Sequence, residues 1–150
     1  IKNSVILGYS NKSHDGYLGN SVIGEWCNLG AGTSTSNMKN NAGEIRMWNH
    51  ALKEMILSGL TKCGLIMGDH SKAAINTSFN TGTTVGVCAN IFGEGAVPKY
   101  VPGFSWGVRN GSKYQFQKAI EDIAKWKKLK NSELTEQEKT VLRLIFDQTK

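Results

Sequence analysis

The sequence predicts a mainly β protein: a parallel β-helix built from six-residue repeats, followed by two C-terminal α-helices. Three observations support this prediction. An aliphatic residue followed by glycine recurs early in the chain, and a second block, residues 67–91, repeats with a period of six. Only the last third of the chain shows the apolar spacing of amphipathic helices. A single domain is expected for 150 residues.

The two repeat blocks define the β-helix. The first contains Leu18-Gly19, Ile23-Gly24 and Leu29-Gly30. The second places these residues six apart: Met67, Ala73, Phe79, Val85 and Ile91. One aliphatic residue per hexad would point inward, and the small residue after it would let the chain turn a corner. Three hexads would close one triangular coil, and stacked coils would pair as parallel strands about 4.8 Å apart.

Residues 38–63 interrupt the six-residue period. Asn40-Asn41-Ala42-Gly43 predicts a turn, and Glu44–Trp48 predicts a short strand. We interpret this segment as an excursion from the repeat. An ordinary α/β fold fits less well, because residues 64–95 show no helical period between the candidate strands. We therefore expect a β-helix domain at residues 1–95 with an excursion at 38–63.

Residues 96–150 are predicted to be a connecting segment and a helical cap. Tyr114–Lys128 carries an apolar stripe formed by Phe116, Ile120, Ile123 and the stem of Lys127. A second helix is predicted after Thr135, because Thr135 and Glu138 have the spacing of a capping box. We expect the two helices to cover the last coil, whose strand edges would otherwise be unpaired.

Composition narrows the function classes. The net charge of +6 and pI of 9.3 favour anionic partners such as phosphates, but the basic residues are not clustered as in nucleic-acid-binding proteins. No run is long and apolar enough for a membrane span. We therefore expect neither nucleic acid nor membrane as a partner. The chain starts at Ile1, inside a patterned segment and without Met, so we expect a fragment that lacks an N-terminal part.

Cysteines and histidines give no pattern typical of a metal site. Cys27, Cys63 and Cys88 form no closely spaced pair, which favours buried thiols of a cytoplasmic protein. The three histidines are well separated, with no close pair: His14, His50 and His70. No metal is therefore predicted in this domain.

His14 has the surroundings of a candidate base. A lone histidine is more often structural, but His14 stands in a polar, glycine-rich stretch with Tyr17 three residues later. Asn28 and Asn37 follow on what would be the next coil. Neutral imidazole is suited to accept a proton from an amine or a hydroxyl near pH 7.

Several segments together resemble one enzyme family. They are Lys2-Asn3-Ser4, Ser13–Gly19, Asn28–Thr33 with Asn37, Gly64–Lys72 and Phe104–Gly107. In these the chain resembles the acetyltransferase half of the bifunctional glucosamine-1-phosphate acetyltransferase/N-acetylglucosamine-1-phosphate uridylyltransferases, and their relatives among the sugar nucleotidylyltransferases. The resemblance implies a left-handed β-helix, acetyl-CoA as cosubstrate, a sugar phosphate as acceptor, and a homotrimer with active sites between subunits.

The resemblance also assigns roles to residues that match the family motif. His14 falls on the general base that deprotonates the acceptor amine, and Asn37 on an asparagine at the acetyl-transfer centre. Lys2 falls on a lysine that holds the acceptor phosphate. Tyr17 and Asn28 fall on acceptor-binding positions. The implied reaction is a direct transfer with no covalent enzyme intermediate.

Ala31 and Gly93 fall on coil edges that line the acetyl-CoA groove, according to the same resemblance. The chain departs from the family at Ile75, where a serine near the acetyl group is expected, and at Asp15-Gly16, which replaces bulkier residues beside the base. These departures leave two alternatives open. One is a non-catalytic β-helix that trimerises or regulates an attached nucleotidylyltransferase, and the other is an O-acetyltransferase of a sugar hydroxyl.

The resemblance does not extend to one lysine of the excursion. The family places a lysine in the corresponding segment, but the excursion at 38–63 is longer here. Lys39 and Lys53 are both candidates for it.

Overall fold

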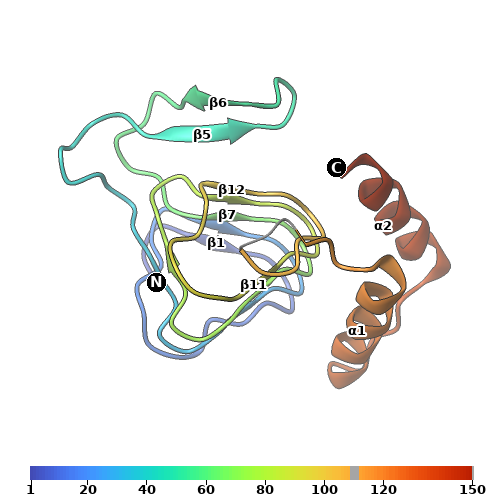
Figure 1. The fold of residues 1–150 in the computed structure, drawn as a ribbon. Helices are drawn as coiled ribbons and strands as arrows, with labels where there is room; N and C mark the ends of the chain where they lie inside the picture. Colours follow the sequence, from blue (N-terminus) through green and yellow to red (C-terminus); the bar gives the residue numbers. More distant parts are fainter. Residues whose placement is uncertain (109–111, 150) are drawn as a thin grey trace.

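The computed structural model describes residues 1–108 and 112–149, and it shows short parallel strands stacked in successive coils (Figure 1). The strands of the coils are β1 (Val5–Ile6), β2 (Val22–Ile23), β3 (Asn28–Leu29), β4 (Ser34–Thr35), β7 (Ile66–Met67), β8 (Lys72–Ala73), β9 (Ser78–Phe79), β10 (Thr84–Val85), β11 (Asn90–Ile91) and β12 (Tyr100–Val101). Each has two residues, because the chain turns a corner after every strand.

The strands line up as three faces. The first face has the order β1-β2-β7-β10-β12, the second β3-β8-β11, and the third β4-β9. All of these pairs are parallel and in register, as between Ile23 of β2 and Met67 of β7. This arrangement has the stacked coils and parallel ladders of the predicted β-helix.

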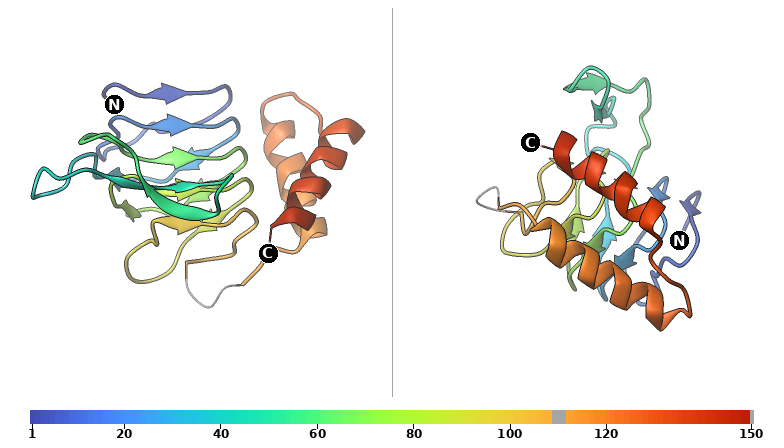
Figure 2. Two further views of the ribbon diagram at one scale, coloured as in Figure 1. Left: turned by 90° about the horizontal axis from the view of Figure 1, so that it is seen from above. Right: turned by 90° about the vertical axis from the view of Figure 1, so that its right-hand side faces the viewer.

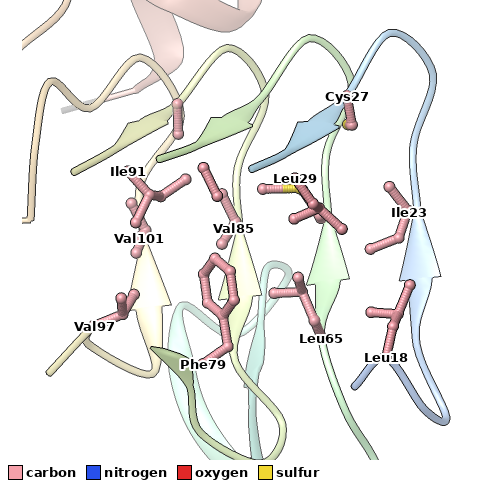
Figure 3. Close-up of a cluster of buried hydrophobic side chains, with 13 residues drawn as sticks. Leu18, Ile23, Cys27, Leu29, Leu65, Phe79, Val85, Ile91, Val97 and Val101 are labelled. Carbon is pink, nitrogen blue, oxygen red and sulfur yellow. The ribbon is translucent and has the colours of Figure 1, made fainter. Parts of the chain in front are cut away.

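The predicted inward positions form the core. Side chains from all three faces meet inside the coils, as Figure 3 shows for Leu18, Ile23, Phe79 and Val85. The five hexad residues from Met67 to Ile91 are all buried in this cluster. Phe79 is the largest of these and is only 3% exposed. Burial of one aliphatic side chain per hexad therefore supplies the hydrophobic stabilisation of the coils.

The glycines of the repeat have a different role from the predicted one. The chain turns each corner at a residue with left-handed backbone, which comes two positions after the glycine of the repeat. The first corner row is the set of corners between the first and second faces, and none of its left-handed residues is glycine. That row consists of Tyr9, Trp26, His70, Cys88 and Phe104, with φ between 54° and 61°. A Cβ at Gly86 would lie 2.3 Å from the backbone nitrogen of Gly103. Glycine after the inward residue is thus required by the closeness of the next coil.

The excursion folds as a β-hairpin over the first face. β5 (Arg46–Asn49) pairs antiparallel with β6 (Glu54–Leu57). β5 and β6 lie beside the strands of the first face (Figure 1). The Trp48 ring stacks on that of Tyr100 with centroids 4.0 Å apart, a contact that joins the hairpin to the coils. The predicted strand at Glu44–Trp48 overlaps β5. Strand β6 was not predicted, because it forms only by pairing with β5.

The two predicted helices are α1 (Phe116–Leu129) and α2 (Glu136–Gln148). The capping box is confirmed: the Glu138 backbone N–H donates to the Thr135 hydroxyl, and the Thr135 N–H donates to the Glu138 carboxylate. The expected position was wrong. The helices lie along the side of the stack, beside the first corner row, and not over its end (Figure 2). Phe104 and Cys88 of that row are buried against them.

The helices also show the packing that their apolar spacing predicts. Ile120, Ile123 and the stem of Lys127 are buried on α1, and Leu142 is buried on α2. Neither helix is long and apolar enough to cross a membrane, as judged over the described residues.

Candidate functional site

His14 lies beside the second corner row, which joins the second face to the third. This row is marked by left-handed backbone at Gly16, Gly32, Asn76 and Gly93. The His14 side chain is exposed to solvent. The Lys12 ammonium group donates hydrogen bonds to the backbone oxygens of His14 (3.1 Å) and Asp15 (2.6 Å). These bonds hold the short loop that presents the imidazole.

Gly16 fits the coil in a way that a larger residue could not. Its φ is +108°, and a Cβ there would lie 2.1 Å from the backbone oxygen of Thr33 on the next coil. The pair Asp15-Gly16, a departure from the family, therefore lets the His14 loop lie close against the coil below. The Gly32 N–H donates to the Asp15 oxygen at 3.2 Å, which joins the two coils at this corner.

Both residues expected at the acetyl-CoA groove lie on the second corner row. The Ala31 oxygen accepts a 2.7 Å hydrogen bond from the backbone N–H of Asn76 on the following coil. Gly93 lines a pocket of about 230 Å³ with Ile75 and Phe92. Ile75, at the position where the resemblance implies a serine, is 68% exposed. One edge of the molecule thus holds His14, Ala31, Ile75 and Gly93 on successive coils.

A second group of predicted residues meets where the third face returns to the first. The Asn37 carboxamide nitrogen donates to the Tyr17 hydroxyl (3.0 Å) and to the side-chain oxygen of Asn20 (2.8 Å). Lys2 pairs through its backbone with the same segment, since the Asn20 N–H donates to its oxygen at 3.0 Å. The side chains of Tyr17, Asn37 and Asn20 therefore meet here, and the backbone of Lys2 joins Asn20 from the preceding coil.

Gly19 provides the space for the Tyr17 ring. A Cβ at Gly19 would lie 2.1 Å from the Tyr17 hydroxyl oxygen. The ring thus folds back over Gly19, in the direction of Asn37, and remains 43% exposed. Glycine at this position therefore lets the Tyr17 ring take this orientation.

Asn28 lies apart from both groups. It is on the second face, in strand β3, where it is aligned with Asn11 on one side and Lys72 on the other. The single chain therefore does not bring Asn28 onto the face that carries Tyr17 and Asn37. The seven predicted site residues occupy two edges and one face of the chain.

The two candidate lysines of the excursion have different places. Lys39 is two residues after Asn37 and donates to the Glu44 oxygen at 3.2 Å. Lys53 is exposed in the hairpin turn, with φ of 53°. Lys99, whose ammonium group reaches the Arg46 oxygen at 3.4 Å, also lies at the base of the excursion. Burial and the charge of Lys39 lower the pKa of Lys99.

Asn20 was not among the predicted residues, although one sequence feature points to it. Its φ is 50°, a conformation that Asn adopts more readily than most residues, and it directly follows Gly19. Across the described residues, no group of three or more His, Cys, Asp or Glu side chains is arranged to hold a metal ion.

The chain is similar in sequence to part of several bifunctional proteins. It is 35% identical over 86 residues to the bifunctional protein GlmU of Methanocaldococcus jannaschii, covering 57% of this chain and 20% of the relative. It is 36% identical over 97 residues to a bifunctional sugar-1-phosphate nucleotidylyltransferase/acetyltransferase of Sulfurisphaera tokodaii, covering 65% and 23%. The GlmU of Synechococcus elongatus is 28% identical over 102 residues, covering 68% and 18%.

The chain thus spans about a fifth of the length of the curated relatives it matches. No known protein-family profile matches it.

Proposed function

The chain is related in sequence to part of the bifunctional sugar-1-phosphate nucleotidylyltransferase/acetyltransferases, and from this premise we propose that it is their acetyltransferase region. It would transfer an acetyl group from acetyl-CoA to the amine of an amino-sugar-1-phosphate. We propose a left-handed β-helix over residues 1–95, with the excursion at 38–63, and a connecting segment with helices over 96–150. In the whole protein, we propose that a nucleotidylyltransferase would accompany this region, as the name of the Sulfurisphaera tokodaii relative indicates for that protein.

One observation supports the proposal above the others: the residue expected to be the base and those expected to bind the cofactor share one edge. His14, Ala31 and Gly93 lie along the second corner row, on the first, second and fourth coils, and Ile75 lies on the third. Acetyl-CoA lying along this row would reach from the pocket at Gly93 towards His14. Backbone donors near Ala31 would stabilise the oxyanion of the thioester carbonyl.

The proposed chemistry needs a single proton acceptor. The amine nitrogen attacks the thioester carbonyl carbon, the C–N bond forms and the C–S bond breaks. His14 takes the proton from the amine, and coenzyme A leaves as the thiol. Lys2 would hold the acceptor phosphate, and Tyr17 and Asn28 would bind the sugar. Asn37 would lie at the acetyl-transfer centre.

We propose a homotrimer because the predicted site residues are divided between separate surfaces of the chain. Asn28 is on the second face, whereas Tyr17 and Asn37 meet at the end of the third. A neighbouring subunit that contributes its own surface could complete the site. The three cysteines are buried free thiols, which supports a reducing compartment such as the cytoplasm.

A thiol-release assay with acetyl-CoA and glucosamine-1-phosphate tests the proposal. We expect release of coenzyme A that falls by about 10²-fold or more in His14→Ala. His50→Ala is the matched control, since His50 is an exposed histidine of the distant hairpin, and it should keep full activity. Galactosamine-1-phosphate and a sugar phosphate with a hydroxyl in place of the amine distinguish the acceptor and separate N- from O-acetylation.

A non-catalytic role is the second candidate. It is favoured by Ile75, an exposed apolar residue in place of the expected serine. If a folded oligomer releases no coenzyme A with any of these acceptors, the chain would instead serve to trimerise or regulate the attached nucleotidylyltransferase.

A further inference from the structure

Asn20 occupies a junction of three segments that are distant in the sequence. Its backbone N–H donates to the oxygen of Lys2 at 3.0 Å, and its backbone oxygen accepts from the N–H of Gly64 at 2.8 Å. Its side-chain oxygen accepts from the Asn37 carboxamide at 2.8 Å. Asn20 thus connects Lys2 on the preceding coil, Asn37 at the start of the excursion, and Gly64 at its end.

The direction of these hydrogen bonds determines which donors and acceptors Asn37 and Tyr17 have left for a ligand. The Asn37 carboxamide has two N–H donors, and both are used, one by the Tyr17 hydroxyl and one by Asn20. The carboxamide oxygen of Asn37 is therefore oriented away from these two partners and can accept. Because the Tyr17 oxygen already accepts from Asn37, its own proton is available to donate.

We propose that Asn20 is a positioning residue, which orients the Asn37 carboxamide so that Asn37 and Tyr17 present one acceptor and one donor to the sugar phosphate. This inference rests on the proposed function. The substrate class that fits the pair has a hydroxyl or amine that donates to the Asn37 oxygen, beside an oxygen that accepts from Tyr17. Without the Asn20 acceptor, the Asn37 carboxamide can rotate and present its N–H groups instead.

The left-handed backbone of Asn20 allows two well-matched substitutions. Asn20→Gly removes the side-chain acceptor, while glycine adopts φ of 50° freely and keeps the backbone bonds to Lys2 and Gly64. Asn20→Asp keeps an acceptor and tolerates the same backbone. Asp cannot donate when ionised, so this variant also tests the direction of the hydrogen bond.

Two measurements test the inference. In the first, the side-chain amide resonances of Asn37 are followed by NMR without substrate, assigned by their loss in Asn37→Asp. We expect them to shift in Asn20→Gly and to stay near their wild-type positions in Asn20→Asp. In the second, we expect KM for the sugar phosphate to rise about tenfold in Asn20→Gly, the size expected for one hydrogen bond, with KM for acetyl-CoA unchanged. Asn20→Asp should restore KM to within about twofold.

The inference is overturned if Asn20→Gly leaves both the Asn37 resonances and the acceptor KM unchanged, or if Asn20→Asp is as impaired as Asn20→Gly. An equal rise in both KM values would also overturn it, because it would indicate a general structural effect. If the wild-type chain transfers no acetyl group, the proposed function fails, and the NMR measurement alone decides whether Asn20 orients Asn37.

Discussion

The ammonium group of Lys127 on α1 forms an ion pair with the carboxylate of Glu138 on α2, and the same carboxylate completes the capping box of that helix. The Lys127 side chain is almost fully buried, and its ammonium lies 5.2 Å from the centre of the Trp26 ring on the first corner row. This contact therefore joins both helices to the coils.

Glu138→Gln is expected to destabilise the fold by about 1–3 kcal/mol, because it leaves the buried Lys127 ammonium without its anionic partner. Glutamine can still serve in a capping box, so the helix start is preserved. Glu136→Gln on the same helix is the control: Glu136 is 84% exposed and pairs with Lys139 at the surface, and we expect a change below about 0.5 kcal/mol. Urea unfolding measures both, and equal effects would contradict the prediction.

His70→Asn is expected to remove part of the pH dependence of stability. Burial and the charge of Lys72 lower the pKa of His70 to about 4 from 6.5, and the charge of Lys127 adds a smaller lowering. The carboxylates of Asp69 and Glu138 raise this pKa but do not outweigh the lowering. Between these values the unfolded chain binds more protons than the folded one. The contribution is therefore complete above pH 6.5 and is lost as pH falls from 6.5 to 4.

The predicted role of His70 is tested by the unfolding free energies of the wild type and of His70→Asn at pH 7, 5.5 and 4.5. Asparagine tolerates the left-handed backbone of His70, with φ of 61°. Glu138 should not obscure the result: burial raises its pKa, but hydrogen bonds from Lys127 and Thr135 outweigh this and keep the pKa below 4.5. A wild-type slope that persists unchanged in His70→Asn would refute the assignment to His70.

Gly19→Ala is expected to weaken acceptor binding with little loss of stability. The added methyl group would meet the Tyr17 hydroxyl, the movable end of a side chain, and would push the ring away from Asn37. We expect KM for the sugar phosphate to rise about tenfold or less, the effect of one lost hydrogen bond. Gly8→Ala is the control, since its Cβ would find only the Glu25 carboxylate, at 3.9 Å. Equal kinetics in both variants would show that Tyr17 does not depend on Gly19.

Trp48→Ala is expected to release the hairpin from the coils, because Trp48 loses its stacking on Tyr100. Hydrogen exchange of the β5 and β6 amides should accelerate, while that of the core strands β7 and β10 should not change. Leu57→Ala removes an exposed apolar side chain of the same hairpin and should leave exchange unchanged. Wild-type protection of the hairpin in Trp48→Ala would contradict the anchoring role.

Local patterns allowed much of the fold to be predicted. A period of six placed Met67, Phe79 and Val85 in one buried core, because each hexad directs one side chain inward. The spacing of Thr135 and Glu138 located the start of α2, since a capping box depends only on residues three apart. Lys2, Tyr17 and Asn37 were singled out as site residues only through a family resemblance.

Tertiary structure decided the rest. The helices pack along the first corner row because Phe104 and Cys88 of that row provide apolar contacts. The apolar spacing within α1 and α2 shows which face of each helix is buried, but it does not show against which surface. Asn20 meets Asn37 only because one full coil brings residues 17 apart into neighbouring positions. By itself the sequence determined what repeats every six residues and what caps a helix, both local properties. The contacts between surfaces of different coils depend on how the coils stack and how closely their backbones approach. A short segment of sequence does not encode these features.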